Sequence, residues 1–194
     1  MCIASQYYEK HAKEYFDSTV ELDIRPLYER FLKYVPSGSH ILDLGCGSGR
    51  DSKAFIDLGY QVSAIDSSPT LCKLAREYTG VNVQCADFLS LGSEPKYNAI
   101  WACASLLHAS RTQLPVILEK IRDIVVRGGA IYSSFKHGEF EGERNGRYYT
   151  DMTSERFREM LAEVNGLSIT EEWYSEDAIK DRKNKWYNVI LCKE

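Results

Sequence analysis

The spacing of apolar residues changes along this chain, and each spacing predicts a different kind of element. Between Ile24 and Val35 the apolar residues recur every three or four positions, which is typical of one face of an amphipathic helix. Tyr8, Ala12 and Tyr15 have a similar spacing and indicate a shorter helix before it. The chain is therefore expected to begin with helices.

From residue 40 onward, short apolar runs alternate with helical stretches. The runs predict strands over residues 40–44, 60–65, 82–86, 97–103 and 130–135. The stretches between them predict helices from about Arg50 to Gly59, from Ser68 to Gly80 and from Thr112 to Gly128. Because a helix separates successive strands, the strands are expected to be parallel with crossover connections.

The end of the chain departs from this alternation. A helix over residues 153–164 is followed by two predicted strands, 167–175 and 185–192, with no helix between them. Consecutive strands joined by a loop usually pair antiparallel. The pattern therefore predicts a doubly wound α/β fold, with a mostly parallel seven-stranded sheet and a C-terminal antiparallel hairpin. At 194 residues we expect one domain. Its parts are a helical cap (1–36), a core (37–135) and a final loop, helix and hairpin (136–194).

Three glycines stand at alternate positions in ILDLGCGSGRDS, residues 41–52, directly after the first predicted strand. Such a loop lies at the carboxyl edge of a parallel sheet, where ligands bind. Glycine allows a ligand to approach the backbone, and the next helix offers unpaired N–H groups. The dinucleotide fingerprint G-x-G-x-x-G does not fit, because Arg50 stands where its third glycine should be. A tight turn without a ligand is the alternative interpretation.

Two further acidic residues follow later strands at matching places. Asp66 ends the second strand in SAIDSS, and Asp87 follows the third in QCADF. With Asp43 before the glycines, the chain resembles class I S-adenosylmethionine-dependent methyltransferases, whose first motif is D/E-x-G-x-G-x-G. The resemblance covers about residues 40 to 135. Within that class the chain looks most like the small bacterial tellurite-resistance-type methyltransferases, which implies a small-molecule acceptor.

The resemblance implies a cofactor, S-adenosylmethionine, and a role for each motif. Its methionine end would be held by Asp43, Gly45, Cys46, Gly47 and Gly49. Its ribose would be bound by Asp66 with Ser67, and its adenine by Asp87 with Phe88. Tyr15, together with Tyr8, could line the sulfonium pocket, since an aromatic face attracts a cation. Tyrosines at helical spacing are also typical of a core.

The segment after the fourth strand, WACASLLHAS, is where the acceptor site is expected. It contains neither the [D/N]-P-P-[Y/F] motif of amino-directed nucleic-acid methylases nor the Pro-Cys pair of pyrimidine C5 enzymes. Cys103 is best interpreted as a buried strand end, and it is kept among the candidates on the cofactor side. His108 is a candidate base or substrate contact; alternatively it only caps the next helix.

Residues 136–152, KHGEFEGERNGRYYTDM, are expected to have little regular structure and to lie over the same edge of the sheet. A loop of this length is often functional. We predict a lid in which Arg144 or Arg147 binds an anionic part of the substrate. The alternative is that these arginines pair with neighbouring carboxylates: Glu139, Glu141, Glu143 and Asp151.

Composition narrows the class of function. The formal net charge is −4, so binding to nucleic acid is not expected. No apolar run is long enough for a membrane span, no secretory signal is visible, and a cytoplasmic location is expected. The six cysteines and four histidines show no ligand spacing, so no metal site is expected.

The predicted function is methyl transfer to a small molecule by in-line displacement. Two alternatives stay open: an RNA-base or protein methyltransferase, and a non-catalytic S-adenosylmethionine-binding sensor or partner. The sequence does not indicate the oligomeric state.

Overall fold

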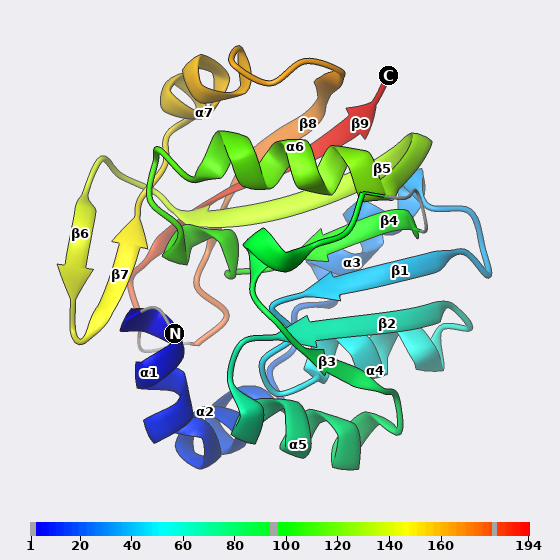
Figure 1. Cartoon of the computed structure of the whole chain (residues 1–194), viewed down its shortest axis with the longest axis vertical. Coiled ribbons are helices and arrows are strands. Elements are labelled where there is room, and N and C mark those ends of the chain that lie inside the picture. The colour runs from blue at the N-terminus through cyan, green and yellow to red at the C-terminus, as the bar shows by residue number, and fades with distance from the viewer. Residues whose placement is uncertain (1–2, 94–96, 180–181) are drawn as a thin grey trace.

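The computed structural model describes residues 3–93, 97–179 and 182–194. Figure 1 shows a twisted sheet covered by helices on both faces. Within the described residues the sheet has seven strands in the order β3-β2-β1-β4-β5-β9-β8. Their bounds are β1 His40–Leu44, β2 Gln61–Asp66, β3 Val83–Cys85, β4 Tyr97–Ala102, β5 Val125–Lys136, β8 Leu167–Glu176 and β9 Lys185–Lys193. This is the predicted doubly wound, mostly parallel seven-stranded sheet with an antiparallel C-terminal hairpin, and the prediction is confirmed.

The helices and short 3-10 turns fall between these strands. The helices are α1 Ile3–Lys10, α2 Ala12–Thr19, α3 Arg25–Phe31, α4 Arg50–Asp57, α5 Pro69–Thr79, α6 Leu114–Ile124 and α7 Ser154–Leu161. The turns are η1 Leu32–Tyr34, η2 Phe88–Ser90 and η3 Leu106–His108. The predicted helices over residues 50–59, 68–80, 112–128 and 153–164 therefore form, with ends a few residues inside those expected.

Alternate residues of each central strand face opposite sides of the sheet, which divides the core into two layers. Leu42 and Ile100 face one layer, which contains α6 and α7. Ile41 and Trp101 face the other layer, which contains α3 and part of α4. All four side chains are fully buried. The burial on both faces explains why these strands read as nearly continuous apolar runs.

The central strand β1 decides where a ligand can bind. β1 pairs in parallel with β2 on one side and with β4 on the other. After β1 the chain crosses to β2, and after β4 it crosses to β5, in the opposite direction along the sheet. The loops that follow β1 and β4 therefore separate at the carboxyl edge. In Figure 1 this edge lies to the left, beside α1 and the hairpin of β6 (Glu141–Arg144) and β7 (Arg147–Thr150). β9 runs antiparallel to both β5 and β8, as predicted for the C-terminal hairpin.

The prediction of little regular structure over residues 136–152 is wrong. β5 continues to Lys136, and β6 Glu141–Arg144 pairs antiparallel with β7 Arg147–Thr150. The turn between them is Asn145-Gly146, with φ values of 53° and 72°. A two-residue turn with both φ values positive matches the right-handed twist of a hairpin, and Asn-Gly is its preferred sequence. The local signal for a hairpin was therefore present in the sequence.

Candidate active site

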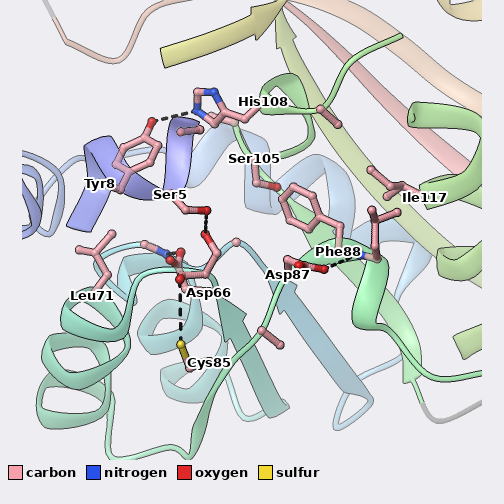
Figure 2. A pocket seen from close by; sticks show the side chains of 18 of the residues that line it. Ser5, Tyr8, Asp66, Leu71, Cys85, Asp87, Phe88, Ser105, His108 and Ile117 are labelled. Carbon is pink, nitrogen blue, oxygen red and sulfur yellow. Dashed lines mark hydrogen bonds between the residues drawn. The ribbon is translucent and has the colours of Figure 1, made fainter. Parts of the chain in front are cut away.

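A cavity of about 400 Å³ opens at the carboxyl edge, between the loops that follow β1, β2, β3 and β4. Figure 2 shows Asp66 near its centre, Asp87 and Phe88 on one side, and Tyr8 with His108 on another. The structure brings nine of the predicted site residues to its wall. They are Tyr8, Tyr15, Gly45, Gly47, Asp66, Ser67, Asp87, Phe88 and His108. We call this space the cofactor cavity.

The glycine loop begins with a tight connection to the neighbouring strand. The N–H groups of Gly45 and Cys46 both donate to the carbonyl of Ile65, at 2.8 and 3.0 Å. Gly45 has a φ of 83°, and an added Cβ would lie 2.4 Å from Cβ of Ser105. At Gly47, φ is 54° and an added Cβ would lie 2.9 Å from Cε1 of Tyr15. Both positions therefore require glycine, for the backbone conformation and for the neighbouring side chain.

Gly49 has a different role from the other two glycines. It is the N-cap of α4, with a φ of 79°. An added Cβ would lie 2.8 Å from Thr79 and 3.1 Å from Ala75, both on α5. Gly49 does not line the cofactor cavity. It allows α4 and α5 to pack closely, and so it shapes the loop from behind.

Asp66 stands at the end of β2, where backbone donors fix its carboxylate. The N–H of Gly47 donates to Oδ2 and the N–H of Ser68 to Oδ1, each at 2.9 Å. Burial raises the pKa of this carboxyl above its usual value. A fixed, partly desolvated carboxylate that lines a cavity is well suited to accept hydrogen bonds from a pair of ribose hydroxyls.

Asp87 and Phe88 occupy the turn after β3. Oδ1 of Asp87 accepts the N–H groups of Leu89 and Ser90, at 2.9 and 3.1 Å, so Asp87 caps η2. Phe88 follows it, and Leu89 and Ile117 add further apolar surface to this side of the cavity. A flat apolar wall next to an acidic side chain fits a purine ring with an exocyclic amine.

Besides Gly49, three predicted residues on the cofactor side do not line the cofactor cavity. Asp43 is buried and accepts a hydrogen bond of 2.6 Å from Ser52 Oγ; burial and the nearby Asp51 raise its pKa. Cys46 is buried in the small apolar cluster between β2, β3 and α5. Burial raises the pKa of the Cys103 thiol to about 12, and Cys103 lines a different cavity. These residues support the site from outside it.

That second cavity has a volume of about 430 Å³ and adjoins the first. Both cavities are lined by Tyr8, Tyr15, Ala104 and His108, which form a shared wall. Basic and aromatic side chains surround the rest of the second cavity. They include Arg50, Lys136, Arg147, Arg182, Tyr149 and Trp186. We call this space the acceptor cavity.

His108 lies in the shared wall with both ring nitrogens engaged. Its Nδ1 is 2.7 Å from the carbonyl oxygen of Tyr148, and its Nε2 is 2.9 Å from the hydroxyl of Tyr8. Because a carbonyl can only accept, Nδ1 carries the proton and Nε2 accepts from Tyr8. Burial lowers the pKa of His108 to about 4, so the ring is neutral near pH 7. Burial likewise raises the pKa of Tyr8 to about 12.

The structure separates the two arginines of the predicted lid. Arg144 forms an ion pair of 2.9 Å with Asp151, stacks against Phe140 and lines neither cavity. Arg147 lines the acceptor cavity, and its Nη1 is 3.5 Å from the hydroxyl of Tyr8. The alternative of pairing with a neighbouring carboxylate therefore applies to Arg144. Arg147 alone stays a candidate for contact with substrate.

Sequence reasoning named Tyr8 of α1 as a residue of the sulfonium pocket, but it did not predict that the start of this helix also covers the cofactor cavity. Ala4, Ser5 and Tyr8 line the cavity from this helix, and Ser5 Oγ is 2.7 Å from Ser67 Oγ. Glu9 fastens the helix to the start of α5, since its carboxylate accepts from Ser68 Oγ and Thr70 Oγ1, both at 2.6 Å. The tyrosine spacing in α1 indicated a helix, but no local pattern shows which part of the sheet such a helix covers.

Comparison with known proteins agrees with this geometry. Residues 41–129 match the family model of a methyltransferase domain. The ubiquinone biosynthesis O-methyltransferase of Xanthomonas axonopodis pv. citri (strain 306) is 31% identical over 106 residues, which are 51% of this chain. The aligned part is 44% of that enzyme, so the chain matches less than half of its length.

Solved structures share the fold at low sequence identity. The Burkholderia thailandensis 1,6-didemethyltoxoflavin-N1-methyltransferase, with bound 1,6-didemethyltoxoflavin and S-adenosylhomocysteine, has a TM-score of 0.80 and 18% identity. That match covers 98% of this chain and 87% of the other. The [4+2]-cyclase SpnF has a TM-score of 0.73 and 17% identity, over 97% of this chain and 94% of the other.

Residues 41–129 are therefore similar to a methyltransferase domain, and the chain shares the fold of S-adenosylmethionine-dependent methyltransferases. The narrower tellurite-resistance-type group stays a prediction. Within the described residues, no helix is both long and apolar enough to cross a membrane. In the same part of the chain, no group of three or more His, Cys, Asp or Glu side chains could hold a metal ion.

Proposed function

We propose that the protein transfers the methyl group of S-adenosylmethionine to a small molecule bound in the acceptor cavity. The observation that carries this proposal is the wall of Tyr8, Tyr15, Ala104 and His108 that the two cavities share. Tyr15 also packs against Gly47, so the glycine end of the cofactor cavity lies at this wall. An acceptor next to the wall would be close to the methionine end of the cofactor.

Bound S-adenosylmethionine would supply an electrophilic methyl group on a positively charged sulfur. The protein then mainly has to align the reacting atoms and exclude water. Asp66 with Ser67 would hold the ribose, Asp87 with Phe88 the adenine, and the backbone at Gly45 and Gly47 the methionine part. The rings of Tyr8 and Tyr15 would stabilise the positive charge by cation–π attraction.

Tyr8 and His108 form a hydrogen-bonded pair through which a proton could leave the acceptor if the acceptor arrives protonated. Tyr8 donates to the neutral Nε2 of His108 across 2.9 Å. An acceptor hydroxyl could pass its proton to the Tyr8 oxygen as Tyr8 passes its own to His108. His108 would then act through Tyr8 and not by direct contact. This differs from the direct role predicted for His108 from the sequence.

The size of the acceptor cavity, about 430 Å³, favours a small molecule over a nucleic-acid or protein segment. The neighbour of the same fold from Burkholderia thailandensis was solved with bound 1,6-didemethyltoxoflavin. An RNA-base or protein methyltransferase remains an alternative. A non-catalytic binder is also an alternative, since the same fold occurs in a cyclase and fold alone does not fix the reaction.

The experiment is a screen for formation of S-adenosylhomocysteine by the purified protein with small thiols, phenols, amines and carboxylates. Tyr8→Phe and Asp66→Asn serve as matched variants that act on different sides of the wall. Turnover with one small acceptor, reduced at least tenfold in Tyr8→Phe while cofactor affinity is kept, supports the proposal. Turnover with only RNA or a protein substrate would replace it by the first alternative. Tight cofactor binding without turnover on any substrate would favour the second.

We also propose a cytoplasmic location. It is supported by the free thiols of Cys46, Cys72, Cys85, Cys103 and Cys192, the cysteines in the described part of the chain.

A further inference from the structure

Among the described residues, some cationic side chains around the acceptor cavity have carboxylate partners and others have none. Arg50 donates to Asp51 through Nε at 2.6 Å, and Arg144, which lies just outside, occupies both oxygens of Asp151. Lys136 and Arg147 line the cavity, and neither forms an ion pair with a carboxylate among residues 3–93, 97–179 and 182–194. Arg147 Nε is buried and has no hydrogen-bond partner there. A buried donor without a partner is destabilising, so this group is well placed to bind a ligand.

These two cations converge on one aromatic ring. Lys136 Nζ lies 4.4 Å and Arg147 Cζ 5.3 Å from the centre of the Tyr149 ring. Burial and the charges of Arg144, Arg147 and Arg182 lower the pKa of Lys136. Like charges held close together in a partly buried site repel each other, and an anion between them would relieve that repulsion.

The two acidic residues in the described wall of the acceptor cavity form no ion pair with Lys136 or Arg147. Asp177 already accepts from Asn184 Nδ2 at 2.7 Å and from the N–H of Ile179 at 3.0 Å. Glu176, the other acidic residue of the wall, is solvent-exposed. The remaining wall mixes polar side chains with an aromatic and apolar part, to which Leu27, Tyr149 and Trp186 contribute.

We propose that the methyl acceptor is a small aromatic molecule that carries a carboxylate or another oxyanion, and that Lys136 and Arg147 hold this anion. The inference rests on the proposed function, because it assigns the second cavity to the acceptor. Nη1 of Arg147 lies 3.5 Å from the hydroxyl of Tyr8, which belongs to the shared wall. An anion bound by Arg147 is therefore close to this wall. The aromatic body of the acceptor then lies against Tyr8 and Tyr15, with its nucleophilic atom toward the cofactor.

The test measures binding to the protein saturated with S-adenosylhomocysteine, using probes that differ in charge but hardly in shape. The probes are 4-hydroxybenzoate and 4-hydroxybenzamide, with phenyl phosphate as a second anion. We expect 4-hydroxybenzoate to bind wild type at least tenfold more tightly than the amide. Phenyl phosphate separates a general oxyanion site from one restricted to carboxylates.

The variants are Lys136→Met and Arg147→Met, with Lys73→Met as the matched control. Lys73 is exposed on α5 and lines neither cavity. In each cavity variant the ratio of the affinities for 4-hydroxybenzoate and 4-hydroxybenzamide should fall at least tenfold. In Lys73→Met this ratio should stay as in wild type. Arg147→Lys keeps the charge without the planar fork, and we expect it to restore part of the preference. Affinity for S-adenosylhomocysteine, measured in every variant, reports that the protein is folded.

Two outcomes overturn the inference while leaving the proposed function intact. One is wild type that binds S-adenosylhomocysteine but binds acid and amide equally, or neither. The other is a preference that Lys136→Met and Arg147→Met both retain. If wild type does not bind S-adenosylhomocysteine at all, the proposed function itself fails.

Discussion

At the scale of single residues, the three glycines of one motif are each required for a different physical reason. Gly45 makes room for Ser105, Gly47 for Tyr15, and Gly49 for the contact between α4 and α5. Only the first two line the cofactor cavity. The spacing G-x-G-x-G identified the loop, but it could not show which glycine faces the ligand, because that depends on side chains far away in the sequence.

Gly47→Ala and Gly49→Ala should therefore have different effects. Both place a Cβ at a positive φ, which costs about 1–2 kcal/mol, and each adds a steric clash of about 1–3 kcal/mol. Gly49→Ala should lower the free energy of unfolding and change the affinity for S-adenosylhomocysteine less than threefold. Gly47→Ala should displace Tyr15 and weaken that affinity at least tenfold. Urea unfolding and calorimetry on both variants provide the check; equal loss of affinity would contradict these roles.

His108 should make stability depend on pH. Its pKa is lowered to about 4 by burial, against about 6.5 in an unfolded chain. As the pH falls, the unfolded state therefore binds a proton before the folded state does. The contribution of His108 to the free energy of unfolding is complete above about pH 6.5 and is lost as the pH falls toward 4. Because the ring is not fully shielded from solvent, we expect an effect of about 1–3 kcal/mol.

Urea unfolding of wild type and His108→Asn at pH 7 and pH 5 tests this prediction. Between these pH values wild type should lose more free energy of unfolding than the variant does. The comparison removes the contribution of carboxylates, which titrate in both proteins. An equal loss in the two proteins would mean that His108 is not buried in its neutral form.

At the scale of elements, the β6–β7 hairpin shows what a sequence can and cannot specify. The Asn-Gly turn predicts a hairpin at residues 145–146, although charged residues around it suggest a loop. The hairpin brings Arg147 and Tyr149 to the acceptor cavity and leaves Arg144 outside it. Arg147 and Tyr149 are alternate residues of β7 and so share a face, whereas Arg144 lies on β6 and pairs with Asp151. These positions can be assigned only once the segment is known to be a hairpin.

Gly146→Val should disturb the acceptor cavity without affecting the cofactor cavity. The residue has a φ of 72°, and an added Cβ would lie 3.2 Å from Cδ2 of Tyr7 on α1. We expect the hairpin to shift, so that binding of 4-hydroxybenzoate weakens at least fivefold while affinity for S-adenosylhomocysteine changes less than threefold. Gly59→Val is the control, since Gly59 also has a positive φ but nothing within 4 Å of an added Cβ. Equal effects on both ligands in Gly146→Val would show that the two cavities are not independent.

At the scale of the whole molecule, the order of helices and strands could be predicted from periodicity, and the strand order followed from the resemblance to a family. The cofactor cavity could be predicted because its main residues follow strands that meet at one edge. The shared wall could not. It depends on contacts such as Tyr8 with His108, 100 residues apart, and Arg147 with Tyr8, 139 apart. Local patterns carry no information about such pairs.

The central claim is that the cavity around Asp66 holds S-adenosylmethionine through its ribose. The most direct measurement is calorimetric titration of S-adenosylmethionine into wild type, Asp66→Asn and the surface control Glu77→Gln. Hydrogen bonds to a charged group are worth about 1.5–3 kcal/mol, so Asp66→Asn should weaken binding about ten- to a hundredfold, and Glu77→Gln should bind like wild type. Equal affinity in wild type and Asp66→Asn, or tighter binding of a nicotinamide dinucleotide than of S-adenosylmethionine, would contradict the claim.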